Sequence, residues 1–508
     1  MCIDSYLISA SFITTQKTTQ AVTIVWMSRA QNYTVFSTCI APNWTCVETH
    51  SERAPEDEWL DILPHPVFSP DGDSFMLLAA IQETNTEHFT HIKHVTITQQ
   101  RISVISHGRY EVLRILAWDT LNHLVYYLGT QDKKPGQQHL YVVKDPVNED
   151  PRRTEPKCIT CGGDVLWSSR YYYENCTHFG AYVAPQSSIS SDAGVDFYIL
   201  ECRGPGLPLA GVHSAKTHRL IKVLYDTRKQ FAHKLDEIAL PKQESFDIQL
   251  THGTRAAVQI QYPPSWRKEL RDAAYPVIVE VNGKPGETSV VDEFRIDWGT
   301  YMSSHNDVIY VRLDVRGARG RGKKKLYRKL GGVEVDDQIA VIEYLLNTHK
   351  FLDRTRVGVW GWGYGGYVTA MVLGSNKRVF KCGIAVSPIT DWLYYNSVFT
   401  ERIMGLPVEN YEGYVKADAT QMAKNIEKDT FFLIHGLADA TAPYHHSIQL
   451  ATALTNAGTI YRYISYADEG HDLRGVTEHV YRSMEHYYKD CLSLDDNSDA
   501  PMDAPVPS

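Results

Sequence analysis

The sequence predicts an all-β region followed by an α/β domain. The chain has 508 residues, which is longer than a single hydrophobic core usually supports, so we expect two domains. Up to residue 240 it consists of short β-rich runs with turn signals between them. Beyond Leu240-Pro241, apolar strand-like runs alternate with helical patterns. We therefore divide the chain into residues 1–240, residues 241–494, and an acidic, proline-rich tail, 495–508, which we expect to be disordered.

Short strands at regular spacing characterise the first region. Residues 22–26, 74–78 and 197–200 are β-rich runs, and segments such as 69–73, which reads SPDGD, have the composition of tight turns. No long helical pattern interrupts these strands. The organisation is typical of a β-sandwich or a β-propeller, and the internal repeats are too weak to choose between the two from the residues alone.

Residues 241–494 have the alternation of strands and helices that produces a parallel sheet. Residues 276–281 and 308–313 are apolar, β-rich runs, which suit buried parallel strands. Residues 335–346 carry apolar side chains at helical spacing. Later strands are expected at 382–386, 431–435 and 461–466. We therefore expect a mostly parallel sheet covered by helices.

The segment 360–366, which reads WGWGYGG, lies between a predicted strand, 356–359, and a predicted helix, 367–373. Strand, glycine-rich turn and helix are the context of the nucleophile elbow of α/β-hydrolases, G-x-S-x-G, in which the middle residue is held out for attack. Here Gly361 and Gly365 frame the motif, and the nucleophile position is Gly363, which has no side chain. The sequence therefore predicts an elbow that lacks its nucleophile.

Two loops after late strands carry the residues that would complete a catalytic triad. Asp439 follows the predicted strand 431–435, and His471 follows the predicted strand 461–466. Positions 363, 439 and 471 have the α/β-hydrolase order of nucleophile, acid and histidine. In a working enzyme the aspartate would accept the Nδ1 proton of the histidine, which would deprotonate the nucleophile. A lone Asp or His is usually structural, but the order, the loops and the elbow together mark these two as former triad positions.

Charge and cysteine content indicate the class of protein and its compartment. The net charge of -9 at pH 7 argues against nucleic acid as the main partner. No apolar run approaches the roughly 18 residues of a membrane span, and no signal peptide is visible. Closely spaced cysteine pairs beside the sequons at Asn32, Asn43 and Asn175 nevertheless suggest a secretory compartment and glycosylation. Because these observations conflict, we expect that the N-terminus is incomplete or alternative.

The pair Cys158 and Cys161 has the CxxC spacing of half a zinc site. No second CxxC and no histidine pair follows at zinc-finger spacing, so we expect no metal and no cofactor.

Several segments resemble one known family. The run 361–369 (GWGYGGYVT), residues 400–407 (TERIMGLP), residues 204–209 (GPGLPL) and residues 31–33 (QNY) are similar to the prolyl oligopeptidase family of serine peptidases, in its dipeptidyl peptidase 4 branch. The resemblance implies the later blades of a β-propeller followed by an α/β-hydrolase domain. It leaves the family's early blades, signal anchor and cytosolic tail without a counterpart here. It also implies four disulfides: Cys39–Cys46, Cys158–Cys161, Cys176–Cys202 and Cys382–Cys491.

Three departures from the family pattern follow from the resemblance. The family's serine falls on Gly363, and the tyrosine that active members use in the oxyanion hole falls on Asn282. The backbone N–H of Tyr364 would remain as the other oxyanion donor. The paired glutamates that hold a substrate's amine in the family belong to the early blades, which have no counterpart in this sequence. The aromatic side chains of the family's specificity pocket largely persist, with the alternative that they are plain core, and they fall on Tyr364, Trp392, Tyr395 and Phe399.

The loss of the serine resembles the non-peptidase, dipeptidyl peptidase-like members of this branch, which are auxiliary subunits of voltage-gated potassium channels. We therefore expect a catalytically inactive, glycosylated binding protein, at the plasma membrane or secreted. The expected partners are a second copy bound through the hydrolase domain, a membrane protein such as a potassium channel by resemblance only, and a peptide ligand. The alternative is a serine-type dipeptidyl peptidase that releases N-terminal X-Pro dipeptides with weak residual activity.

Overall fold

The computed structural model describes residues 5–14, 20–84, 88–145, 155–162, 172–183, 194–250, 253–269, 274–321 and 326–494. The expected tail, 495–508, and Cys2 lie outside these residues. The chain divides into two compact units. The first consists of Met1–Lys234 with the short segments Val291–Phe294 and Glu401–Leu406, and the second consists of Leu235–Val290, Arg295–Thr400 and Pro407–Ser508.

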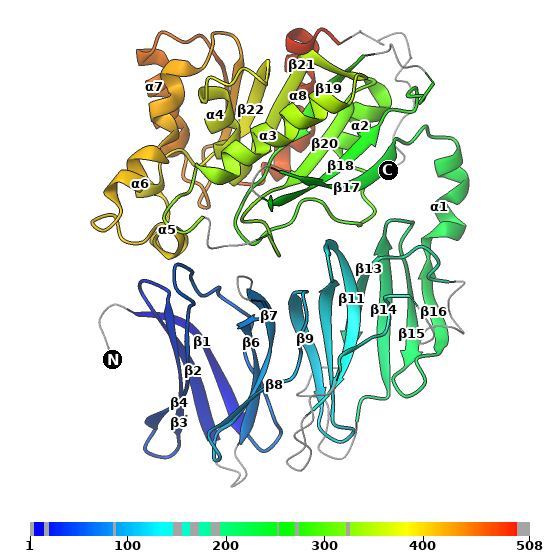
Figure 1. Cartoon of the computed structure of the whole chain (residues 1–508), viewed down its shortest axis with the longest axis vertical. Coiled ribbons are helices and arrows are strands. Elements are labelled where there is room, and N and C mark those ends of the chain that lie inside the picture. Colours follow the sequence, from blue (N-terminus) through cyan, green and yellow to red (C-terminus); the bar gives the residue numbers. More distant parts are fainter. Residues whose placement is uncertain are drawn as a thin grey trace. The chain divides into compact units, whose positions relative to one another are not determined.

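The first unit is built from four-stranded antiparallel meanders. Two of them form separate sheets, and the last two are joined by a parallel strand pair into one eight-stranded sheet. Figure 1 shows these strands side by side. This repeated arrangement is the blade pattern of a β-propeller. The first meander comprises β1 (Ser5–Thr14), β2 (Gln20–Ser28), β3 (Tyr33–Ile40) and β4 (Thr45–Arg53), and the second β5 (Val67–Phe68), β6 (Ser74–Gln82), β7 (His88–Thr96) and β8 (Arg101–Val104). The third comprises β9 (Val112–Asp119), β10 (Leu124–Gln131), β11 (Lys134–Lys144) and β12 (Lys157–Cys158), and the fourth β13 (His178–Val183), β14 (Phe197–Gly204), β15 (Leu209–Ser214) and β16 (Leu220–Asp226).

Strand alternation lets each inner meander bury both of its faces. On β6, Phe75 and Leu77 belong to a cluster with β2 and β3, whereas Met76 lies in a cluster with β9, β10 and β11. On β10, Tyr127 joins that second cluster, and Tyr126 turns to a third cluster shared with β13 and β14. Successive side chains of a strand point to opposite faces, so one strand serves two interfaces.

Disulfides tie strands and helices together in both units. Cys39–Cys46 joins directly opposed residues of β3 and β4, Cys158–Cys161 closes a short turn, and Cys176–Cys202 reaches from the loop before β13 to β14. In the second unit, Cys382–Cys491 joins a central strand to the last helix. These are the four pairs that the resemblance implied.

The second unit contains an eight-stranded sheet in the order β17-β18-β20-β19-β21-β22-β23-β24. The pairs from β20 through β24 are parallel, and β17 and β18 are antiparallel. Its strands are β17 (Lys242–Gln249), β18 (Arg255–Tyr262), β19 (Tyr275–Glu280), β20 (Ile309–Asp314), β21 (Leu352–Trp362), β22 (Cys382–Val386), β23 (Phe431–Gly436) and β24 (Arg462–Tyr466). Every residue of β20, β22 and β23 is buried, and for β20 this agrees with the buried strand predicted at 308–313.

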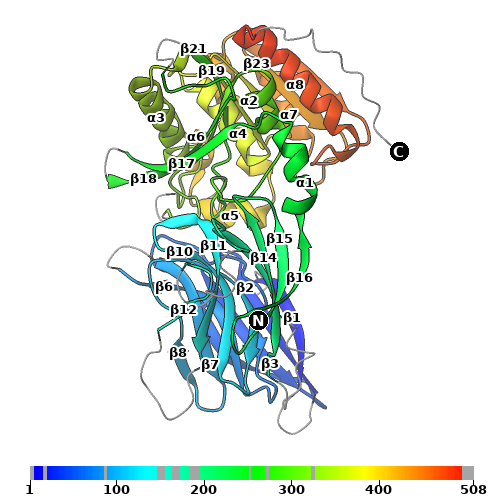
Figure 2. The ribbon, with the colours of Figure 1, turned by 90° about the vertical axis from the view of Figure 1, so that its right-hand side faces the viewer.

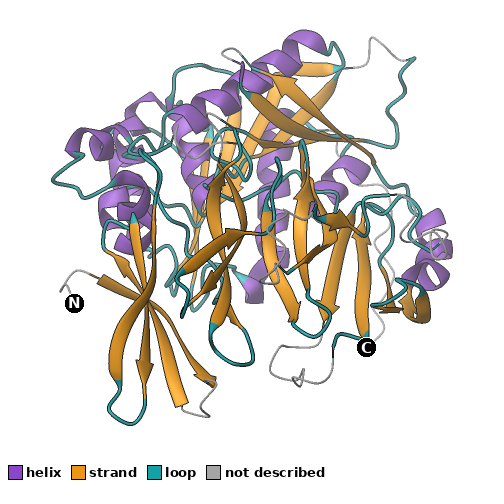
Figure 3. Cartoon of the chain, turned by 60° about the horizontal axis from the view of Figure 1, so that its bottom comes forward, coloured by secondary structure: helices purple, strands orange, loops and turns teal. Residues whose placement is uncertain are grey.

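Helices cover both faces of this sheet. The helices are α2 (Trp298–His305), α3 (Val333–Thr348), α4 (Tyr364–Gly374), α5 (Ser397–Met404), α6 (Tyr411–Lys416), α7 (His445–Asn456) and α8 (Thr477–Leu492), and α1 (Thr227–Asp236) follows β16. Residues of α2 and α8 share one core cluster with the sheet, and α3 lies on the opposite side in Figure 2. Figure 3 shows that helices gather in this unit, whereas strands make up most of the first. No helix among the described residues has the length and apolar character needed to span a membrane.

Candidate active site

The sharp turn between β21 and α4 is the elbow that the sequence predicted. Gly363 stands at its apex with φ 57° and ψ −109° and is the N-cap of α4. A side chain at this φ is strained, and glycine adopts it freely. The surroundings of the turn are tight, because a Cβ at Gly365 would lie 2.1 Å from the carbonyl oxygen of Val281. The backbone N–H of Gly363 donates to Val386 over 2.9 Å, which fixes the apex against β22.

His471 and Asp439 form a hydrogen-bonded pair at this apex. Nδ1 of His471 lies 2.7 Å from Oδ2 of Asp439. A carboxylate can only accept, so Nδ1 carries the proton in this bond. Nε2 faces the elbow, since a Cβ on Gly363 would lie 3.1 Å from it. The backbone of His471 is also held, because its carbonyl oxygen accepts from Nε1 of Trp362 over 2.8 Å. The loops thus bring together all three positions that the triad order selected.

Asp439 has a second histidine neighbour, His435 at the end of β23. Nε2 of His435 donates to the carbonyl oxygen of Ala442 and lies 3.2 Å from Oδ2 of Asp439. The other carboxylate oxygen accepts the backbone N–H groups of Thr441 and Ala442 over 2.8 and 2.9 Å. Burial alone would raise the pKa of Asp439. The hydrogen bonds from His435, His471 and the Ala442 backbone outweigh it and hold that pKa well below its usual range.

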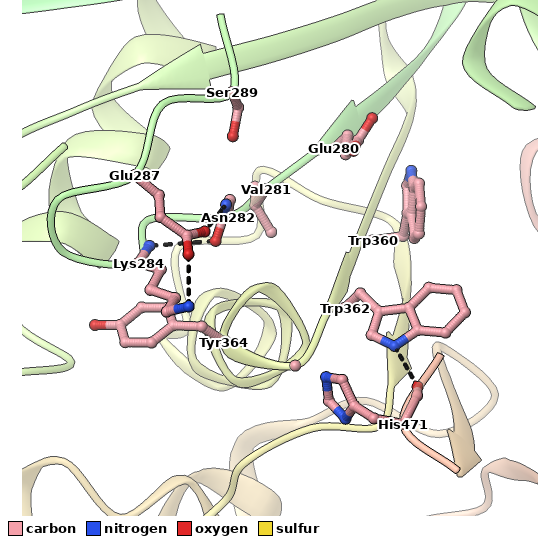
Figure 4. A pocket seen from close by; sticks show the side chains of 11 residues that line it. Glu280, Val281, Asn282, Lys284, Glu287, Ser289, Trp360, Trp362, Tyr364 and His471 are labelled. Carbon is pink, nitrogen blue, oxygen red and sulfur yellow. Dashed lines mark hydrogen bonds and ion pairs between the residues drawn. The ribbon is translucent and has the colours of Figure 1, made fainter. Parts of the chain in front are cut away.

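A cavity of ≈ 240 Å³ opens beside the elbow (Figure 4). Gly363, Tyr364 and His471 lie on its wall, together with the loop after β19 and two tryptophans. The full lining is Glu280, Val281, Asn282, Lys284, Glu287, Ser289, Trp360, Trp362, Gly363, Tyr364 and His471. Carboxylate, amide, ammonium and hydroxyl groups make much of this wall polar.

Asn282 occupies the position where the resemblance implies the oxyanion tyrosine. Its Nδ2 donates to Oε2 of Glu287 over 3.3 Å, and Lys284 binds the other oxygen of the same carboxylate. One amide N–H of Asn282 is therefore directed to Glu287. Tyr364 is the first residue of α4, so its backbone N–H has no acceptor within the helix. This N–H is the remaining candidate oxyanion donor.

The expected pocket aromatics gather against Tyr364. Trp392 is 1% exposed, and its ring lies 5.4 Å from Tyr364 and 5.6 Å from Phe399 between centroids. Tyr395 lies 5.7 Å from both Trp392 and Phe399. Trp392 is core, whereas Tyr395 and Phe399 are half-buried. The cluster therefore contains one fully packed ring, Trp392, and two rings, Tyr395 and Phe399, that are partly exposed.

A buried carboxyl lies directly behind the elbow. The hydroxyl of Tyr364 donates to Oε1 of Glu334 over 2.9 Å, and the backbone N–H of Gly331 binds the same oxygen. The side-chain oxygen Oε2 of Glu334 has no hydrogen-bond partner, and the residue is fully buried. Burial raises the pKa of Glu334 to about 7, although its hydrogen bonds oppose the shift.

Other predicted positions belong to the first unit. Asn32, Asn43 and Asn175 are exposed, as a glycosylation acceptor must be. Among the described residues, one group of potential metal ligands lies within 4.8 Å, namely His139, Cys158 and Cys161. Because the two sulfurs form a disulfide, they are not available as thiolate ligands.

Sequence reasoning missed three groups at the site: His435, Glu334 and the pair of Lys284 with Glu287. His435 lies four residues before Asp439 at the end of a predicted strand, and that spacing was a usable signal. Glu334 sits in an apolar helical pattern, where an acidic residue on the buried face was the available sign. Nothing in the sequence indicated that Glu287 would bind Asn282.

Comparisons with known proteins agree with this geometry. Residues 294–495 match the Prolyl oligopeptidase family, and residues 2–209 match the Dipeptidyl peptidase IV (DPP IV) N-terminal region. The chain is 32% identical to dipeptidyl peptidase 4 of Sus scrofa over 97% of its own length. It is 32% identical to prolyl endopeptidase FAP of Homo sapiens over 94%. It spans 61% of the length of each of these relatives.

A solved structure has the same fold. The crystal structure of Porphyromonas gingivalis dipeptidyl peptidase 4 matches with a TM-score of 0.81 at 21% sequence identity, and the match covers 97% of this chain and 64% of that one. The predicted fold class, propeller-type sheets before an α/β-hydrolase domain, is thereby confirmed. The chain belongs to the prolyl oligopeptidase family, alongside dipeptidyl peptidase 4.

Proposed function

We propose that this chain is a dipeptidyl peptidase-like protein that does not carry out serine peptidase chemistry and acts through binding. The observation that carries the proposal is Gly363 at the apex of an otherwise complete elbow. Nucleophilic catalysis needs a hydroxyl or thiol beside the base, and a glycine offers neither. Asp439 and His471 can move a proton, but they have no attached group to activate.

The oxyanion position gives independent support. Asn282 stands where active relatives are expected to use a tyrosine hydroxyl, and one of its two amide N–H groups already donates to Glu287. Loss of one such donor lowers kcat by roughly 10²–10³ in a serine protease. Restoring a serine at position 363 alone would therefore leave the site with lower activity than that of an active relative.

Binding makes different demands from turnover, and this site meets several of them. A ligand needs concave surface with apolar area and a few polar anchors. The cavity supplies two tryptophans and a polar wall. The half-buried rings of Tyr395 and Phe399 do not line this cavity, but they belong to the ring cluster that contains Tyr364 on its wall. We propose a short peptide with a small apolar ring, such as proline, as the ligand class.

The alternative is a serine-type dipeptidyl peptidase that releases X-Pro dipeptides weakly. The 2.7 Å bond between His471 and Asp439 favours it, because the acid–base pair retains the arrangement that catalysis requires. This alternative needs a nucleophile from outside the elbow.

We also propose an extracellular location and two kinds of protein partner. Exposed sequons and four disulfides suit an oxidising compartment, and the resemblance suggests glycosylation and attachment to the plasma membrane or secretion. A second copy bound through the hydrolase domain, and a membrane protein such as a voltage-gated potassium channel, are the partners suggested by resemblance. Sedimentation of the purified chain tests the first, and co-purification with a channel tests the second.

A fluorophosphonate probe tests the central proposal, because such probes phosphonylate an activated serine. We expect no labelling of the full chain under conditions that label an active dipeptidyl peptidase 4 to completion. Stoichiometric labelling that His471→Ala abolishes would contradict the proposal. It would show that another hydroxyl has taken the place of the missing one.

A further inference from the structure

The cavity beside Gly363 is lined by His471, whose imidazole can accept a proton. Its volume of ≈ 240 Å³ exceeds the roughly 30 Å³ that one water molecule takes up in the liquid several times over. Gly363 and His471 both lie on the wall, so a molecule in the cavity can contact both. The carboxylates, the amide and the hydroxyl of Ser289 around it are groups that hold water.

The orientation of His471 suits a base. Its Nδ1–H donates to Asp439, and the lowered pKa of that carboxyl keeps the acceptor ionised at neutral pH. In the neutral imidazole the lone pair lies on Nε2, which faces the elbow where a serine Oγ would stand in an active enzyme. A Cβ on Gly363 would lie only 3.1 Å from Nε2, so an added methyl group would crowd the same place.

We infer that the pair Asp439–His471 activates water in this cavity and hydrolyses small activated esters without a covalent intermediate. Nε2 takes one proton from water while the water oxygen adds to the ester carbonyl. The tetrahedral oxyanion accepts a hydrogen bond from the backbone N–H of Tyr364. The bond to the leaving oxygen then breaks, and Nε2–H returns the proton, giving one carboxylic acid and one alcohol.

The same geometry limits the substrate. With one backbone donor and no anchored nucleophile, the barrier for an amide stays high, so peptides are excluded and esters of acidic phenols are favoured. Positioned general-base catalysis contributes roughly 10²–10⁴-fold. This activity goes beyond the proposed binding role. The result of the ester-hydrolysis assay does not depend on whether a fluorophosphonate probe labels a serine, so the two proposals can fail separately.

The experiment measures steady-state hydrolysis of p-nitrophenyl acetate by the full chain. Three variants are compared: His471→Gln, Gly363→Ala, and His486→Gln as a matched control. His486 lies on α8 with 75% of its side chain exposed, so it reports hydrolysis by surface imidazole. We expect kcat/KM to fall at least about 10²-fold in His471→Gln. It should fall similarly in Gly363→Ala and remain unchanged in His486→Gln.

Two further readouts separate water attack from attack by the imidazole itself. A proton moves in the rate-limiting step of general-base catalysis, so the reaction should be slower in heavy water. Intact-mass spectrometry during turnover should find no acetylated protein. Equal rates in the wild type and His471→Gln would overturn the inference, and so would a transient acetyl group on His471. If Gly363→Ala does not fold, His471→Gln and the isotope effect decide the question.

Discussion

Glu334, the buried carboxyl behind the elbow, should make the hydrolase unit less stable as the pH rises. Its folded-state pKa is about 7, against an ordinary value of 4.5. Below pH 4.5 the carboxyl is protonated in both the folded and the unfolded chain. Between these two values the folded state holds a proton that the unfolded state has released, so stability falls with rising pH and levels off above the folded-state pKa.

The size of the effect follows from the two pKa values. A difference between about 7 and 4.5 at 1.36 kcal/mol per pKa unit gives about 3 kcal/mol in total, most of which falls between pH 5 and pH 8. Gln at this position is neutral at every pH and has the same shape. The stability of Glu334→Gln should therefore rise by about 2–3 kcal/mol relative to the wild type between pH 5 and pH 8, whatever the difference between the two proteins at pH 5.

The assay is urea unfolding of both proteins at several pH values. Because two units can unfold separately, hydrogen exchange identifies the transition that exposes α3. Asp336→Asn is the matched control, since it neutralises an exposed carboxylate in the same helical turn. If the wild type and Glu334→Gln lose stability in parallel, to within about 0.5 kcal/mol, Glu334 does not hold the proton and the reasoning is refuted.

The remaining predictions concern the nucleophile position and the disulfides. Gly363→Ser alone should not restore efficient dipeptide release, because φ 57° costs a side chain about 1–3 kcal/mol and Asn282 remains tied to Glu287. Adding Asn282→Tyr should raise kcat/KM for a proline-containing ester, and dipeptide release by the single mutant at the rate of an active relative would contradict this. Thiol titration of native, secreted protein should find no free cysteine other than Cys2, so eight or nine free thiols would refute the disulfides. Opening Cys382–Cys491, which are 109 residues apart, should cost about 4–5 kcal/mol in urea unfolding.

The fold was largely predictable because its signals are local. An apolar, β-rich run predicted β20, the alternation of strands and helices predicted β22 and β23, and the glycine-rich turn predicted the junction of β21 and α4. The choice between sandwich and propeller was not available from the residues. It depends on which strand face meets which neighbour, and Phe75 and Met76 look alike in sequence although they enter different clusters.

The only part of the site that could be predicted is the set of triad positions, because their order along the chain is typical of α/β-hydrolases. The spacing of Gly363, Asp439 and His471 could be interpreted because a loop follows each parallel strand at one edge of the sheet. The bond from Asn282 to Glu287 joins two residues of one loop through a conformation that no periodicity encodes. The pKa of Glu334 depends on complete burial, which follows from packing between α3 and α4 and not from composition.

The bonds of Asp439 have a consequence for which triad positions a fold retains. Two backbone N–H groups and His435 hold this carboxylate whether or not chemistry occurs, so its loss would leave the buried N–H of Ala442 unpaired and remove an acceptor from His435. The His471 ring, by contrast, is 23% exposed and bonds Asp439 through one nitrogen. In a chain released from hydrolysis, the requirement to fold preserves the aspartate and leaves the histidine free to drift. The acid therefore says little about present activity, and the imidazole is the residue whose retention carries information.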